Sequence, residues 1–227
     1  MVGAMWGPAT APSLPASSDC EAFTGGFWGQ PVNSVTSLAF VAVGAAILVA
    51  YRSGGRGVAT YALLTAATGA GSFIFHGPAP QWSELVHDAP LVALLAYVAT
   101  DAAADVLGRR LSALWWLLPT AATVLLTGFA GPGGTVAQVL VGAAAGAAVL
   151  LRFWRRSTTR RTILIAGVVL GAGALIGALS RTGGPWCDPD SLIQGHGIWH
   201  LFAAAGLWFL TPIVGRIHVA AHLNPAR

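Results

Sequence analysis

The sequence predicts an all-α membrane protein, a bundle of seven transmembrane helices with its N-terminus outside and its C-terminus inside. Three observations lead to this prediction. The chain of 227 residues is 55% hydrophobic and only 9% charged, whereas about 25% of the residues in soluble domains are charged. It contains seven apolar stretches, each near the length of about 20 residues that crosses a bilayer as a helix. Eleven of its twelve arginines lie in loops on one side of these stretches.

The apolar stretches have to be helices, because a backbone exposed to lipid must satisfy its own hydrogen bonds. None of them alternates between apolar and polar residues as a barrel strand would. The fourth stretch is the shortest. The predicted helices cover residues 33–51, 57–76, 88–107, 112–129, 134–153, 162–180 and 193–215.

The arginines set the orientation of the bundle, because basic residues in short loops favour the cytoplasmic side. The chain has no lysine, and only Arg181 falls on the opposite side from the other arginines. An N-terminus outside and a C-terminus inside also require an odd number of spans. The arginines on the inner side are Arg52, Arg56, Arg109, Arg110, Arg152, Arg155, Arg156, Arg160, Arg161, Arg216 and Arg227.

We expect a single integral membrane domain over residues 1–227. Within it, residues 1–32 form an external, proline-containing arm, 33–215 form the bundle and 216–227 form a cytoplasmic tail. The arm lacks a basic start and an apolar core, so we expect no cleavable signal peptide. The net charge of +4 reflects topology and not nucleic-acid binding, so the partner is the lipid bilayer. Abundant Ala and Gly without Lys indicate a GC-rich bacterial genome and a multi-pass protein of the plasma (inner) membrane.

Three histidines map to the outer ends of two predicted helices. His76 ends the second stretch, which runs outward, and His196 and His200 begin the seventh, which runs inward. A histidine inside a bilayer needs a partner or a task, and a lone one is explained by an interhelical hydrogen bond. Two that share one helix face, with a third at matched depth, predict a metal site. Three histidines with an open fourth position are typical of catalytic zinc.

A second histidine pair of the same spacing, His218 and His222, falls on the inner side. Eighteen residues separate His200 from His218, which is about 27 Å of helix. This pair therefore cannot join the predicted zinc site.

Polar residues flank the predicted zinc site. Ser72 lies one turn before His76 and shares its face. Asp88 begins the third predicted helix on the outer side. It either caps that helix, or it accepts a proton from zinc-bound water or orients a ligand histidine. His87 next to it is either an interfacial loop residue or a competitor for that role.

Toward the inner end of the third predicted helix stand Asp101 and Asp105. We expect them to pair with Arg109 and Arg110, which follow in the next loop.

Both cysteines, Cys20 and Cys187, map to the outer side. An oxidising location favours a disulfide, and two cysteines allow only one pairing. The alternative is two free thiols in separate loops. The acidic residues near these cysteines form either a solvated outer surface or a calcium site; they are Asp19, Glu21, Asp188 and Asp190.

Four short motifs follow one another along the chain. They are Cys20-Glu21 before the first predicted helix, Ser72 four residues before His76, an acidic residue after them, and His196 four residues before His200. Together they resemble the alkaline ceramidases, which belong to the CREST superfamily of heptahelical membrane hydrolases, as do the adiponectin-type receptors. The most specific match is the run Gly71-Ser72-Phe73-Ile74-Phe75-His76.

The resemblance implies a zinc-dependent amidohydrolase, a ceramidase, that acts in sphingolipid metabolism and cleaves ceramide to a sphingoid base and a fatty acid. It also implies a disulfide that joins the two cysteines. By motif match, the zinc ligands are His76, His196 and His200, and the serine and the acid are Ser72 and Asp88.

Two positions depart from the family pattern. In the family the acid follows the motif histidine by eleven residues, and in this chain that position is His87, with Asp88 one residue later. Either the register shifts by one residue, or His87 has replaced the acid. The family's calcium segment, Asp-Trp-Cys-Glu-x-Asn, is reduced here to Cys20-Glu21, which argues against a calcium ion.

We therefore expect hydrolysis of a ceramide-like membrane lipid at zinc. Asp88 or His87 would take the proton of the attacking water, and Ser72 would donate a hydrogen bond to the developing oxyanion. Two alternatives stay open at this point. One is a zinc hydrolase of another lipid acyl bond, an ester or a glycolipid. The other is a non-enzymatic, receptor-like bundle with structural zinc.

Overall fold

All regular secondary structure in the described part of the chain is helical. The computed structural model describes residues 19–129 and 133–215, and these contain α-helices, one 3₁₀ turn and no strand. The remaining residues, which include most of the predicted arm and the pair His218 and His222, lie outside the described residues. The helices are α1 (Pro31–Ala50), α2 (Gly55–His76), α3 (Ser83–Leu107), α4 (Leu114–Phe129), α5 (Gly133–Arg155), α6 (Arg160–Leu179) and α7 (Gly195–Leu210).

The all-α membrane class is confirmed in its main feature. By length and composition, five of the described helices are long and apolar enough to cross a membrane, namely α1, α2, α3, α5 and α6. α4 is a shorter apolar helix, and α7 has 16 residues because the chain leaves the helix at Thr211. The predicted seventh segment, 193–215, is therefore longer than the helix that forms.

The start of α3 differs from the prediction and changes the interpretation of Asp88. The helix begins at Ser83 and not at 88, and Trp82 occupies its N-cap position. Polar residues open the helix, and Glu84 in its first turn suits the positive end of the helix dipole. A hydropathy window misses such a turn. Asp88 consequently lies inside the helix, so the suggestion that it caps α3 is wrong.

Glycines bring α2 close to both of its neighbours at the level of Ser72. A Cβ atom on Gly71 would lie 1.9 Å from the carbonyl oxygen of Val86 on α3, and one on Gly69 would lie 2.8 Å from that of Ser37 on α1. The backbones therefore touch at these two points, and only glycine permits the approach. α1 also packs against α7, and α7 against α6.

A buried ionic cluster joins α3, α5 and the segment that follows α7. Arg152 on α5 forms ion pairs with Asp101 at 3.0 Å and with Asp105 at 2.7 Å. It also donates to the Ile213 carbonyl at 2.8 Å. The partner found for the α3 aspartates is thus an arginine of α5, whereas the sequence analysis expected Arg109 and Arg110. Those two arginines follow α3 in sequence, whereas Arg152 reaches Asp101 across the α3–α5 packing face.

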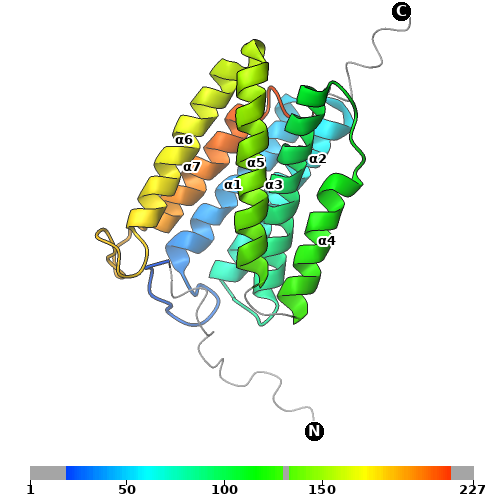
Figure 1. The fold of residues 1–227 in the computed structure, drawn as a ribbon. Coiled ribbons are helices and arrows are strands. Elements are labelled where there is room, and N and C mark those ends of the chain that lie inside the picture. Colours follow the sequence, from blue (N-terminus) through cyan, green and yellow to red (C-terminus); the bar gives the residue numbers. More distant parts are fainter. Residues whose placement is uncertain (1–18, 130–132, 216–227) are drawn as a thin grey trace, which may run out of the picture.

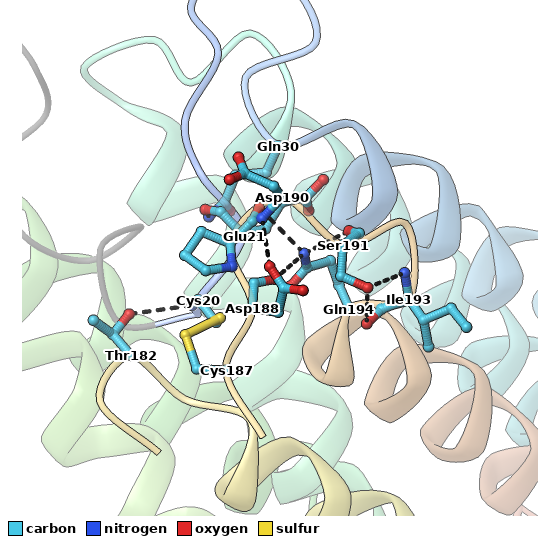
Figure 2. The surroundings of a disulfide bond; sticks show 11 residues. Cys20, Glu21, Gln30, Thr182, Cys187, Asp188, Asp190, Ser191, Ile193 and Gln194 are labelled. Atoms are coloured by element: carbon cyan, nitrogen blue, oxygen red, sulfur yellow. Dashed lines mark hydrogen bonds between the residues drawn. A yellow bond between two sulfur atoms is a disulfide. The ribbon is translucent and has the colours of Figure 1, made fainter. Parts of the chain in front are cut away.

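The loops that carry the two cysteines lie at the same end of the bundle (Figure 1). The predicted disulfide is confirmed, with Cys20 and Cys187 bonded and their Cα atoms 5.5 Å apart. The Cys20 N–H donates to Thr182 Oγ1. The Gln194 side-chain amide donates to the carbonyls of Asp188 and Ser191, in the loop that follows Cys187 (Figure 2). The arm is therefore fixed to the segment that leads into α7.

Candidate metal centre

The structure brings together the three histidines predicted as ligands. His76 is the last residue of α2, and His196 and His200 occupy the first two turns of α7. Their ring centroids are 4.6 to 5.2 Å apart, and one nitrogen from each lies within 4.8 Å of the others. His76 and His200 are 1% and 3% exposed. Three neutral nitrogens at this separation suit a single ion.

The orientation of His76 follows from its contact with Gln30. The Gln30 Nε2 group donates to the Glu21 carbonyl at 2.8 Å, so the other end of the amide, Oε1, faces His76. That oxygen can only accept, and it lies 2.7 Å from His76 Nδ1. Nδ1 must therefore carry the proton, which leaves the lone pair on Nε2. Among the described residues, His76 Nε2 is buried and has no hydrogen-bond partner.

His200 is held in the same way by α1. Its Nδ1 lies 3.1 Å from Thr36 Oγ1, and the Thr36 hydroxyl donates to the Val32 carbonyl at 2.8 Å. With its proton used there, Thr36 accepts from Nδ1–H of His200. Gly197 permits this contact, since a Cβ atom on it would lie 3.1 Å from Thr36 Oγ1.

His196 completes the pattern through the arm. Its Nδ1 is 3.5 Å from a carboxylate oxygen of Asp19, which is 6% exposed. A carboxylate accepts, so this contact again favours the proton on Nδ1 and the lone pair on Nε2.

The donor set therefore fits zinc. Each histidine has its Nδ1 beside an oxygen, and such contacts fix the tautomer of metal-binding histidines. The three oxygens belong to Gln30, Thr36 and Asp19, none of which the sequence analysis assigned to the site. The sequence did contain one signal, the polar residues at the start of the apolar helix α1, which include Gln30 and Thr36. Polar side chains are costly in a bilayer and therefore indicate a function.

Ser72 lies beside this cluster, as its spacing from His76 predicts. Its Oγ is 3.4 Å from His200 Nε2 and 2.8 Å from Ser37 Oγ. The Ser37 hydroxyl in turn lies 2.7 Å from the Asn33 carbonyl. Ser72 is 2% exposed, so its hydroxyl belongs to the interior of the bundle.

His87 and Asp88 form a hydrogen-bonded pair. His87 Nδ1 lies 2.8 Å from Asp88 Oδ1, and the Gln138 amide of α5 donates to the same oxygen. Asp88 is 2% exposed, and its other oxygen, Oδ2, has no partner among the described residues. The His87 ring packs against Phe75 and lies 6.2 Å from the ring of His76. His87 is thus more than an interfacial loop residue.

The acidic residues of the arm are not a solvated surface. Glu21 is buried, and its two carboxylate oxygens accept from the N–H groups of Val32 and Asn33 at 2.7 and 2.9 Å. It thereby caps α1, where Pro31 leaves no N–H of its own. Burial raises the pKa of the Glu21 carboxyl, while the two N–H groups act in the opposite direction. Both oxygens already have donors, so Glu21 is not arranged for calcium; Asp188 and Asp190 are exposed.

Within the described residues, the histidine trio is the one group of metal-ligating side chains that meets closely enough to share an ion. No protein-family model matches the chain, and no curated protein matches it. The chemistry of the site therefore has to be argued from its own residues. They provide three nitrogen lone pairs, a serine hydroxyl and a buried carboxylate with one oxygen unbonded.

Proposed function

We propose that this protein is a zinc-dependent membrane hydrolase that cleaves the amide bond of ceramide-like lipids to a sphingoid base and a fatty acid. The observation that carries the proposal is the common tautomer of His76, His196 and His200, in which an oxygen beside each Nδ1 leaves the lone pair on Nε2; the lone pair of His200 faces Ser72 Oγ at 3.4 Å. The ceramidase-like motifs support the choice of substrate. Zinc bound by these histidines would supply Lewis-acid polarisation of the substrate carbonyl and a more acidic water.

We assign the role of general base and general acid to Asp88. Oδ1 is held by His87 and Gln138, so the carboxylate cannot rotate without losing two donors. Oδ2 would take a proton from the attacking water and return it to the leaving amine as the carbon–nitrogen bond breaks. His87 acts through Asp88 in this scheme, as the group that holds Oδ1.

Ser72 would donate a hydrogen bond to the oxygen that becomes negative in the transition state. Ser37 donates its own proton to the Asn33 carbonyl at 2.7 Å, so it accepts from Ser72, whose Oγ lies 2.8 Å away. The Ser72 hydroxyl would therefore turn from Ser37 to the substrate oxygen as the negative charge develops. Burial of both residues excludes bulk water, which strengthens such a bond.

The membrane setting belongs to the same proposal. Seven spans, an outside N-terminus and a bacterial inner membrane would place the histidines in the outer half of the bilayer. Five helices have the length and composition to span, and the arginine distribution supports the orientation. A lipid amide then reaches the centre without leaving the bilayer.

The test combines metal analysis with a lipid screen. Purified protein should contain one zinc per chain and should release fatty acid from ceramide, as followed by mass spectrometry, and a chelator should stop the release. Turnover of lipid esters without turnover of any amide would move the assignment to another acyl hydrolase. A protein that binds zinc and hydrolyses neither would be a receptor-like bundle with structural zinc.

A further inference from the structure

The side chain of Asn33 is buried without satisfying either end of its amide. The residue is 0% exposed, and neither Nδ2 nor Oδ1 has a hydrogen-bond partner in the part of the chain that the structure describes. Reversing the amide would change nothing, because both ends lack a partner. A buried polar group in this state is costly and uncommon in native proteins. We therefore expect the Asn33 side chain to have a function that offsets this loss of stability.

The position of Asn33 on α1 places it in the wall of the candidate metal centre. Three residues before it, Gln30 contacts His76, and three residues after it, Thr36 contacts His200. Residues spaced three or four apart share a helix face. Ser37, one turn further on, reaches Ser72 at 2.8 Å. Asn33 therefore lies between the contacts that α1 makes to the histidines and to the serine.

The backbone of Asn33 is fixed on both sides. Its N–H donates to Glu21 at 2.9 Å, and its carbonyl oxygen lies 2.7 Å from the Ser37 hydroxyl. The side chain therefore extends from a backbone that is hydrogen-bonded at both its N–H and its carbonyl. Gln30 makes an instructive comparison, because it carries the same amide group on the same helix and bonds through both ends.

We propose that Asn33 recognises the carboxamide of the substrate, a role that rests on the proposed lipid amidase function. Nδ2–H donates to the carbonyl oxygen of the lipid amide, and Oδ1 accepts its N–H. A carboxamide offers one donor and one acceptor side by side, and it complements another carboxamide at both positions. An ester of the same shape lacks the N–H and leaves Oδ1 buried without a partner. Asn33 thereby selects amides over esters.

Other enzymes discriminate between similar substrates in the same way. A site built to bond a substrate N–H rejects an analogue without it far more strongly than an apolar pocket rejects a missing methylene. The preference is a property of binding, so it does not require the metal. It can therefore be measured apart from hydrolysis.

The experiment uses the full-length protein in detergent after zinc removal by a chelator. Binding of a fluorescent short-chain ceramide is compared with binding of its ester analogue, in which oxygen replaces the amide N–H. We expect wild-type protein to bind the amide at least about tenfold more tightly. Asn33→Ala, and Asn33→Leu as a variant of similar volume, should lose this preference and bind the ester as the wild type does.

Ser34→Ala is the matched control. Ser34 is the next residue on α1, is equally buried, and its hydroxyl donates only to the Gln30 carbonyl at 2.7 Å. This variant should keep the preference for the amide. The Asn33 variants should also keep a full zinc content when reloaded, and their unfolding temperature should not fall, because they remove an unsatisfied polar group.

Three results would overturn the assignment. Equal affinity of wild-type protein for amide and ester would mean that Asn33 does not distinguish the two lipids. Loss of zinc from both Asn33 variants would make Asn33 a metal ligand, and an equal loss of both lipids would make it a packing residue. Hydrolysis by zinc-loaded wild-type protein is scored separately. If it fails while the amide preference persists, the proposed function falls and the role of Asn33 stands.

Discussion

Gln30 is joined to His76 by two hydrogen bonds, one through the backbone and one through the side chain. The Gln30 N–H donates to the His76 carbonyl at 2.7 Å, and Gln30 Oε1 lies 2.7 Å from His76 Nδ1. The Gln30 amide also reaches back to Glu21. The arm before α1 therefore fixes both the position and the tautomer of a residue at the end of α2.

This contact predicts a graded effect on metal affinity. Gln30→Leu should weaken zinc binding by about 10- to 100-fold, because His76 loses the acceptor that holds its Nδ1 proton. Gln30→Glu keeps that acceptor and should lose less. Competition with a chromophoric chelator measures both. Thr65→Val serves as the control, since Thr65 is buried and its hydroxyl donates to the Tyr61 carbonyl of its own helix. A Leu variant with wild-type affinity would remove Gln30 from the site.

Replacement of a ligand should have a larger effect. His196→Ala should lose most of its zinc by elemental analysis, because two nitrogens hold the ion far less well than three. His222→Ala has the same change in charge and side chain but belongs to the other histidine pair, and it should retain zinc. Equal zinc content in the two variants would contradict the assignment of the metal centre.

The pair His87 and Asp88 can be separated by conservative changes. Asp88→Asn should lower turnover about 10²-fold or more, because the amide cannot accept a proton. His87→Gln should be mild, since glutamine can still donate to Asp88 Oδ1. Both variants should keep their zinc. An active Asp88→Asn with an inactive His87→Gln would transfer the acid–base role to His87.

The ionic cluster predicts a stability effect far from the metal centre. Arg152→Ala leaves the buried Asp101 carboxylate without its 3.0 Å partner, which should cost about 3–5 kcal/mol. The double change Arg152→Met with Asp101→Asn should recover much of the loss. Thermal unfolding in detergent checks both. A double variant as unstable as Arg152→Ala would show that the packing of Arg152 matters more than its charge.

The sequence predicts the helices well because burial in lipid is a composition effect. The predicted segment 57–76 differs from α2 only at its start. One failure occurs where polar residues take part in a helix, at Ser83 and Glu84, which open α3 before the apolar run begins. The same limit misplaced Asp88, whose helical position depends on that turn.

The candidate site was likewise predicted only in part from the sequence. Helix direction and spacing suffice to predict that His76 meets His196 and His200, and the structure confirms this grouping. The residues that hold their Nδ1 atoms were not predicted. Asp19 and His196 lie far apart in sequence, and their contact depends on how the arm folds back over α7. No local pattern contains that information.

The disulfide also imposes an order on how the protein is made. Cys20 precedes α1 and Cys187 follows α6, so the bond encloses six helices in one covalent ring. During synthesis from the N-terminus, Cys20 has no intramolecular partner until all six have emerged. Among the helices that the structure describes, only α7, which carries His196 and His200, lies outside the ring. Of the described helices α7 is therefore made last, and it brings two of the three candidate ligands to His76 on α2.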